Sequence, residues 1–172
     1  MYLVSMGRLG WFGRLEEDRA LYRRWSATVL REWLSIGDYV LHQKLGVPFE
    51  LVPVPRDLPL LAVPGAQPEF RKRSLGGETE NGGNVRLVLL PNEFPYALEA
   101  GVRHEVLWCS SPVSVSLLEE WLQAHIFDRE VIFFVNPLPL QSVAAVFHAH
   151  VLSRARSSCA AEPRVLDRDS DI

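Results

Sequence analysis

The sequence predicts a single α+β domain in which an antiparallel β-sheet carries its helices on one side. Two amphipathic helical segments open the chain, and β-rich runs dominate its second half. One further helical segment separates two pairs of these runs, which is typical of an antiparallel sheet crossed by a helix. The length of 172 residues fits one domain, which we expect to span residues 1–154.

The first helical segment covers residues 14–34. Its apolar stripe has a spacing of four residues and consists of Leu21, Trp25, Val29 and Trp33. A second helix is predicted over residues 36–45, with Ser35 as its cap, Asp38 as the capping-box partner and Gly46 at its end. Residues 14–46 are therefore predicted to form a helical hairpin.

Residues 47–84 have a different composition. Six of the twelve prolines lie between Pro48 and Pro68, and several glycines follow. We interpret this segment as a long linker, and its basic triplet, Arg71 to Arg73, as a solvated loop.

The sheet core is predicted over residues 85–154. Its four β-rich runs are Val85 to Leu90, Val102 to Trp108, Val131 to Val135 and Val146 to Leu152. A third helix is expected from Ser116, with Glu119 in the capping-box position. Residues 155–172 are rich in Ala, Ser and Asp and predict a disordered tail.

The composition limits the classes of partner and the location. The formal net charge is −3, so we expect no nucleic-acid partner, and no stretch approaches the ~18 apolar residues of a membrane span. Only Cys109 and Cys159 are present, which excludes a disulfide framework and favours a cytoplasmic or nucleocytoplasmic location. The five tryptophans indicate a well-filled core, with room for one or two of them to line a cleft.

Three of the five histidines lie on predicted strands. His148 and His150 share one face of their strand, because alternate side chains point the same way. If the strand that contains His104 is a neighbour with a matched face, three imidazoles meet in one site. His42 and His125 are interpreted as surface residues.

Three readings of this cluster stay open on spacing alone. In the first, an imidazole attacks phosphorus. In the second, neutral imidazoles bind zinc or iron. In the third, the histidines are half-buried sheet residues that bond to their neighbours.

Loop residues supply the candidate substrate-binding groups. Asn92 and Tyr96 flank Pro95 in a loop that forms either a ligand rim or a structural turn. Gln141 and Ser142 offer oxyanion donors or close a loop. Asn136, in a turn signal with Pro137, completes the set of candidates.

Four stretches of the chain resemble the fungal N-acetylglucosamine-induced protein family, an intracellular family with a domain of unknown function. The stretches are Ser35 to Gly46, Leu90 to Tyr96, Val102 to Trp108, and Phe133 to Val151 without its variable turn. The family pattern has Asp-Trp in place of Glu93-Phe94, Lys in place of Gln141 and Glu in place of Phe147. The last departure removes an acid that would sit beside His148.

The chain also resembles the histidine-triad nucleotide hydrolases and transferases. The shared features are an Asn-x-x-Pro loop, a strand with a His, a helix, and Gln-Ser-Val before a His-rich strand. The resemblance implies an α+β fold similar to that of the histidine-triad proteins, with His148 in the nucleophile position. Val146 replaces the first His of the triad, and Gln141 stands one residue too far away.

The leading functional hypothesis is a phosphoester or nucleotidyl hydrolase or transferase. His148 is its nucleophile, His150 its partner, and His104 the third imidazole of the site. The alternatives are a zinc or iron site at the three histidines and a non-catalytic protein that binds a sugar-type metabolite. In each reading the partner is a small molecule, and the sequence does not determine the oligomeric state.

Overall fold

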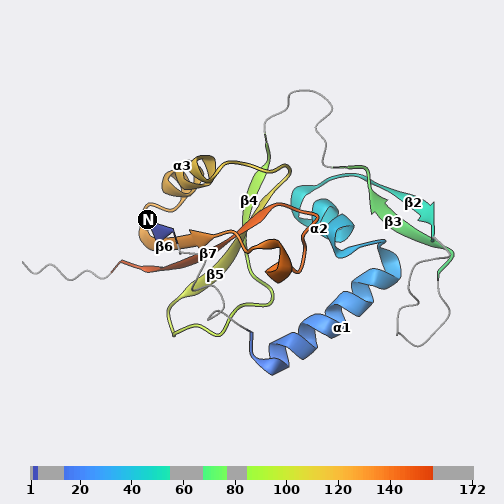
Figure 1. Cartoon of the computed structure of the whole chain (residues 1–172), viewed down its shortest axis with the longest axis horizontal. Coiled ribbons are helices and arrows are strands. Elements are labelled where there is room, and N and C mark those ends of the chain that lie inside the picture. Colours follow the sequence, from blue (N-terminus) through green and yellow to red (C-terminus); the bar gives the residue numbers. More distant parts are fainter. Residues whose placement is uncertain (1, 4–13, 55–67, 77–84, 157–172) are drawn as a thin grey trace, which may run out of the picture.

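A computed structural model describes residues 2–3, 14–54, 68–76 and 85–156. The elements in chain order are β1 (Tyr2–Leu3), α1 (Glu16–Glu32), α2 (Ile36–Leu45), β2 (Phe49–Pro53), β3 (Phe70–Ser74), β4 (Leu87–Pro91), β5 (Arg103–Cys109), α3 (Val115–His125), β6 (Arg129–Phe134), the 3-10 turn η2 (Leu138–Leu140) and β7 (His148–Ala155). They form a five-stranded sheet in the order β1-β6-β7-β5-β4 and a separate two-stranded sheet, β2-β3 (Figure 1).

The five-stranded sheet confirms the predicted α+β class. Strands β4, β5, β7 and β6 pair with their neighbours in antiparallel fashion, while β1 adds a parallel edge to β6. Each of the four β-rich runs forms one of the antiparallel strands, with ends that differ by one to three residues from those predicted. The β-branched composition of these runs is therefore sufficient to identify the strands.

The helices cover both faces of this sheet, so the prediction of helices on one side is wrong. Leu118 and Leu122 of α3 pack with Leu107 and Val151 on one face. Helix α2 packs on the other face, where Val40 contacts a cluster that includes the partly buried Trp108. Figure 1 shows α3 and α2 on opposite sides of the central strands. The order of elements does not specify a face, and only the nearly continuous burial of β5 and β7 reveals two covered faces.

The ends of the helices follow local rules. Ser35 accepts a hydrogen bond from the backbone N–H of Asp38 at 3.0 Å and donates to its carboxylate at 2.6 Å, as predicted. Gly46 ends α2 in the left-handed region, with φ of 70°. The cap of helix α3 lies two residues earlier than predicted, because Ser114, and not Ser116, accepts from the backbone N–H of Leu117 at 3.2 Å.

The segment predicted as a linker contains the antiparallel pair β2–β3. Its strand β3 is anchored to the helical hairpin, since Ser74 Oγ donates to the carbonyl of Asp38 at 2.7 Å and Leu34 N–H donates to the carbonyl of Lys72 at 2.9 Å. The sequence did not predict these strands because prolines lie on both sides of them and proline is unfavourable in strands. Pro53 is nevertheless tolerated at the end of an edge strand. Residues 55–67 and 77–84 of the predicted linker lie outside the described residues.

The basic triplet is part of β3 and is not a solvated loop. Arg71 is only 3% exposed. Lys72 pairs with Glu32 at 2.8 Å and Arg73 with Glu50 at 2.6 Å. The charges of Lys72 and Arg73 are thus compensated by ion pairs within the fold.

Two further expectations concern the chain ends and membranes. Strand β7 continues to Ala155, and most of the predicted tail, residues 157–172, lies outside the described residues. Among the helices that the structure describes, none has the length and apolarity needed to cross a bilayer. The extent of the domain and the cytoplasmic location stay predictions.

Candidate functional site

The register of β5 and β7 places the three strand histidines on one face of the sheet. Val106 lies opposite His150, and Trp108 lies opposite His148. His104 is two residues from Val106 and therefore shares this face. Its Nε2 atom lies 2.9 Å from Nδ1 of His150, and both side chains are buried. The alternation of side chains along the strands thus predicts the cluster that the structure contains.

The backbone fixes the tautomers of the His104–His150 pair. The backbone N–H of Tyr96 donates to Nδ1 of His104 at 3.0 Å, so a neutral His104 carries its proton on Nε2. That proton is donated to Nδ1 of His150, which leaves the proton of a neutral His150 on Nε2. Both rings are therefore held in one orientation and one tautomer.

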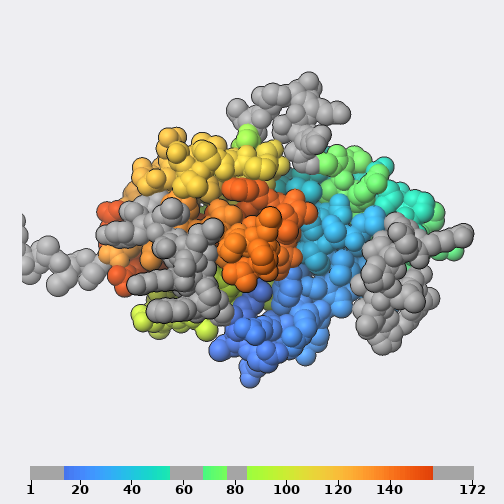
Figure 2. All heavy atoms as spheres, viewed as in Figure 1, coloured from blue at the N-terminus to red at the C-terminus, as the bar shows by residue number. Residues whose placement is uncertain are grey.

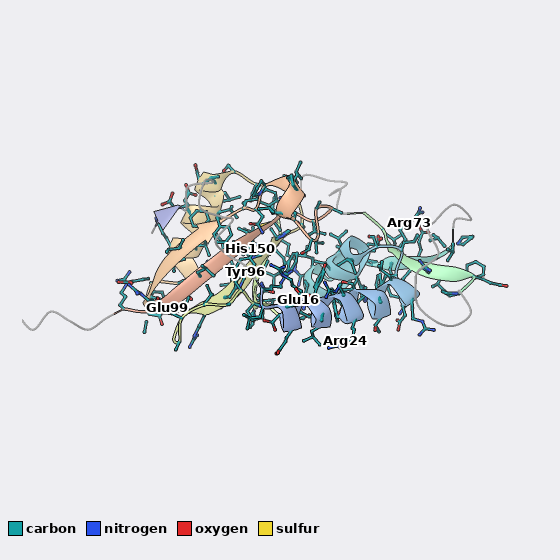
Figure 3. All side chains as sticks on the ribbon, turned by 60° about the horizontal axis from the view of Figure 1, so that its bottom comes forward. Glu16, Arg24, Arg73, Tyr96, Glu99 and His150 are labelled. Carbon is teal, nitrogen blue, oxygen red and sulfur yellow. The ribbon has the colours of Figure 1, made fainter. Side chains whose placement is uncertain are left out.

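Asn136 and Tyr96 complete this hydrogen-bond chain. The amide group of Asn136 lies 3.0 Å from Nε2 of His150 and 3.1 Å from the hydroxyl of Tyr96. A half turn of the asparagine amide group exchanges the positions of its oxygen and its nitrogen. Because Nε2 of His150 carries a proton, the amide oxygen is the group that accepts from it. Figure 3 shows His150 and Tyr96 side by side where the sheet meets the helices. The chain runs from Tyr96 N–H through both imidazoles to Asn136.

Burial keeps the pair neutral. The pKa of His104 falls to about 4, first because burial disfavours the charged ring and second because Arg14 is nearby. The pKa of His150 falls to about 3, mainly by burial and further through the neighbouring His104, His148 and Arg14. Near pH 7 these two histidines act as neutral hydrogen-bonding groups.

His148 has a different environment from this pair. Its Nδ1–H donates to the carbonyl of Val146 at 2.7 Å, and its ring lies 4.9 Å from the indole ring of Trp108, between ring centroids. Burial lowers its pKa, while the bond to Val146 opposes this shift. A neutral ring with its proton on Nδ1 has its lone pair on Nε2. Among the described residues, no hydrogen-bond partner occupies that Nε2 atom.

A pocket of about 60 Å³ lies beside His148, between the sheet and the helical hairpin. Trp25 and Trp108 both line it, in agreement with the expectation that one or two tryptophans line a cleft. Figure 2 shows the segment between β6 and β7, in orange, lying between α3 in yellow and the blue helices. This segment supplies Ser142 and Val143 to the pocket wall.

The predicted site residues fall into three groups. The pocket is lined by Asn92, Ser142, His148 and His150. His104, Tyr96 and Asn136 stand behind this wall and hold His150, as described above. Gln141 lies apart from the pocket, since its Nε2 donates to the carbonyl of Asn136 at 2.6 Å and so closes the loop.

The two remaining histidines differ from each other. His125 is exposed, as predicted, and stacks on Trp121 with 3.8 Å between ring centroids. His42 is half-buried, because its ring packs against Trp33 and Phe49 and its Nδ1 bonds to the carbonyl of Val47. The helical pattern could not reveal that β2 covers this side of α2.

The arrangement of the three imidazoles does not gather three free nitrogen atoms. His104 and His150 direct one nitrogen each at the other ring, and Nδ1 of His148 faces a backbone carbonyl. Within the part of the chain that the structure describes, no group of three His, Cys, Asp or Glu side chains has the arrangement of a metal site. The donor set therefore does not fit zinc or iron without rearrangement.

Several pocket residues were not predicted from the sequence. Arg14, Lys44 and Tyr39 come from the helical hairpin and line the same pocket as His148. A signal was present, because Trp25 and Tyr39 are aromatic residues on neighbouring helices. Sequence periodicity shows which helix face is apolar and does not show that this face covers the histidines.

Fold and site together define an α+β protein with a buried imidazole chain beside a pocket. The chain belongs to the family described as Protein of unknown function (DUF3605), whose model matches residues 1–120. His104 and Asn92 lie within the matched residues, whereas His148 and His150 lie beyond them.

Two known proteins are similar to the chain. The uncharacterized protein YPL067C of Saccharomyces cerevisiae is 39% identical over 79 residues, which cover 36% of this chain and 40% of that protein. The crystal structure of HTC1 superposes with a TM-score of 0.53 at 22% identity, over 89% of this chain and 83% of that one. At this identity the likeness shows the fold alone.

Proposed function

We propose that the protein is a phosphoester or nucleotidyl hydrolase or transferase, similar to the histidine-triad proteins, that uses His148 as its nucleophile. One observation carries the proposal. The carbonyl of Val146 holds the proton of His148 on Nδ1, so the lone pair on Nε2 is available at a pocket. A neutral imidazole held by an acceptor on its other nitrogen is the state that nucleophilic catalysis requires.

In the proposed reaction, Nε2 of His148 forms a bond to phosphorus while the bond to the leaving oxygen breaks. The leaving group takes its proton from water. A second water, or an acceptor hydroxyl, then forms a bond to phosphorus while the bond between phosphorus and Nε2 breaks. It gives its proton to the hydroxide left by the first step, and the imidazole returns to its neutral form. Asn92 and Ser142 line the same pocket. The side chain of Asn92 already accepts from the backbone N–H of Phe94 and contacts the ring of His104, so the hydroxyl of Ser142 is the donor proposed for the oxygens of the phosphoryl group.

The His104–His150 pair is assigned a positioning role. Both nitrogens of His150 are already engaged, with His104 on one side and with Asn136 on the other. His150 therefore does not serve as the proton partner of His148 that the sequence hypothesis assigned to it. Its ring lies 5.6 Å from that of His148, between centroids, in an edge-to-face arrangement that holds the nucleophile in place.

The test is a search for a covalent intermediate. Nucleoside phosphoramidates, dinucleoside polyphosphates and nucleotide sugars are screened for turnover, and a phospho- or nucleotidyl-imidazole is trapped at neutral or alkaline pH, because the bond is acid-labile. His148→Ala should abolish both turnover and the adduct. His125→Ala, which changes an exposed histidine on α3, is the matched control and should retain both. Full turnover in His148→Ala would exclude the nucleophile.

A second candidate is a non-catalytic protein that binds a sugar-type metabolite. It is favoured by the aromatic residues of the pocket wall, Trp25, Tyr39 and Trp108, because aromatic side chains offer large apolar surface to the apolar side of a sugar ring. Binding of a sugar phosphate without turnover, unchanged in His148→Ala, would support this candidate over the enzyme.

The proposal also includes a more specific family for the chain. We propose membership of the N-acetylglucosamine-induced proteins on the four matching stretches named above, with a small molecule as the partner. The departures at Phe147 and Val146 predict that any activity differs in its proton transfers from that of the histidine-triad enzymes.

A further inference from the structure

Two cationic side chains from the helical hairpin line the His148 pocket. Arg14, just before α1, donates from Nε to the carbonyl of Phe94 at 2.9 Å and lies over the ring of Tyr22. Lys44, in the last turn of α2, pairs with Glu93 of the loop after β4. The only acid that lines the pocket among the described residues is Glu93, so the pocket has an excess of positive charge.

The two partners of the Lys44–Glu93 pair differ in exposure. The Lys44 side chain is 19% exposed, and that of Glu93 is 48% exposed. An ion pair with a half-exposed partner contributes about 0–1 kcal/mol to stability. Replacing Glu93 by another anion therefore costs little free energy. Glu93 returns to water readily, whereas Lys44 stays at the pocket because its stem is packed.

The size of the pocket limits the anion. An interior volume of about 60 Å³ is several times the minimum of about 10–15 Å³ that one water molecule needs, so a compact group such as phosphate fits in it. The organic part of a ligand would lie along the aromatic wall at Trp25 and Tyr39.

We propose that Lys44 is the anion-binding residue of this pocket, that it exchanges Glu93 for the dianion of a phosphate monoester, and that Arg14 supplies the second positive charge. The proposal deepens the proposed function, on which its link to phosphoryl chemistry rests. The binding step itself does not depend on His148 as a nucleophile.

The basic triplet of β3 does not provide an equivalent site. Lys72 and Arg73 form ion pairs on the surface of the β2–β3 sheet, and none of the three residues lines the pocket. Lys72 is therefore a matched control, since Lys72→Met also removes one lysine from an ion pair with a glutamate.

The experiment is calorimetric titration of the full chain with inorganic phosphate at pH 7.5 and constant ionic strength. Wild type should bind phosphate saturably. Lys44→Met, which keeps the apolar stem, should weaken binding at least tenfold, and Lys44→Arg should restore most of it. Glu93→Gln should tighten binding several-fold, because Lys44 loses its competing partner. Lys72→Met should bind like wild type.

Two results would overturn the proposal: the absence of saturable phosphate binding, or equal binding by Lys44→Met and wild type. Unfolding curves establish that each variant is folded, and the Lys44→Arg and Glu93→Gln variants test the same residue if Lys44→Met fails to fold. The two proposals fail separately. Phosphate binding that depends on Lys44 supports this inference even if no enzymatic turnover is found, and turnover that depends on His148 but not on Lys44 supports the proposed function alone.

Discussion

Nε2 of His104 lies 2.9 Å from Nδ1 of His150, on one face of a sheet that is covered on both faces. The contact joins two strands, β5 and β7, at positions that are diagonal to each other in the register. Because the backbone N–H of Tyr96 fixes the first ring, a single direction of donation runs through both imidazoles. This order requires both rings to be neutral, which makes the pair sensitive to acid.

The first prediction is a loss of stability in mild acid. The pKa values of His104 and His150 are about 4 and about 3 in the folded protein, and histidine titrates near 6.5 in an unfolded chain. Below pH 6.5 the unfolded state therefore binds more protons. The free energy of unfolding should fall as pH decreases, by up to ~1.4 kcal/mol per pH unit for each histidine.

Urea unfolding at pH 7.5, 6.0 and 5.0 measures this slope. His104→Gln should reduce it, whereas His125→Gln, on the exposed end of α3, should leave it as in wild type. A wild-type protein that is equally stable at pH 7.5 and 5.0 would contradict the neutral pair.

The second prediction concerns the far end of the hydrogen-bond chain. Asn136→Asp places a carboxylate about where the amide now lies 3.0 Å from Nε2 of His150. An adjacent negative charge favours the imidazolium, so the pKa of His150 should rise well above its value of about 3. Titration of the ring nitrogens by NMR measures the change. Asn136→Leu removes the acceptor without adding charge and should instead lower stability by ~1–3 kcal/mol.

The third prediction tests how α2 docks on the segment that carries Ser142. A Cβ atom at Gly37 would lie 2.9 Å from Cβ of Ala145, closer than packed carbon atoms approach. Gly37→Ala should therefore destabilise the protein by ~1–3 kcal/mol, although alanine is the better helix former. The double variant Gly37→Ala with Ala145→Gly should recover most of the loss. Additive effects in this double-mutant cycle would show that the two positions do not touch.

The sequence predicts local features of this fold better than it predicts their placement. The cap at Ser35, the stop at Gly46 and the shared face of His148 and His150 depend on neighbours in the chain, and the structure contains all three. The second covered face of the sheet depends on which side each connection crosses, which periodicity does not record. The β2–β3 sheet was missed because proline-rich composition usually indicates a loop.

In the candidate site, too, local features are predictable from the sequence and the placement of distant segments is not. Strand alternation suffices to group the three imidazoles, since the relation is set by a period of two. The direction of each ring nitrogen is set by groups from other segments, such as Tyr96 N–H and the amide of Asn136. Lys44 reaches the pocket only because α2 crosses the histidine face, so no spacing in the sequence marks it.

The last prediction compares a substitution on one face of the sheet with a substitution on the other face. Leu118 of α3 is fully buried against the face that points away from the histidines. Leu118→Ala should lower the free energy of unfolding by ~2–5 kcal/mol, because it removes buried methyl groups and leaves a cavity. The imidazole signals of His148 in NMR spectra should nevertheless keep their wild-type chemical shifts, since α3 does not line the pocket.

Val40 on α2 provides the matched comparison. It is also buried, but it packs on the histidine face and lines the pocket. Val40→Ala should cost less stability, because fewer methyl groups are removed, and yet it should shift the His148 signals clearly. Changes of equal size at His148 in the two variants would mean that the two faces are mechanically coupled. In that case the rigid strands β5 and β7 would not isolate the site from the α3 core.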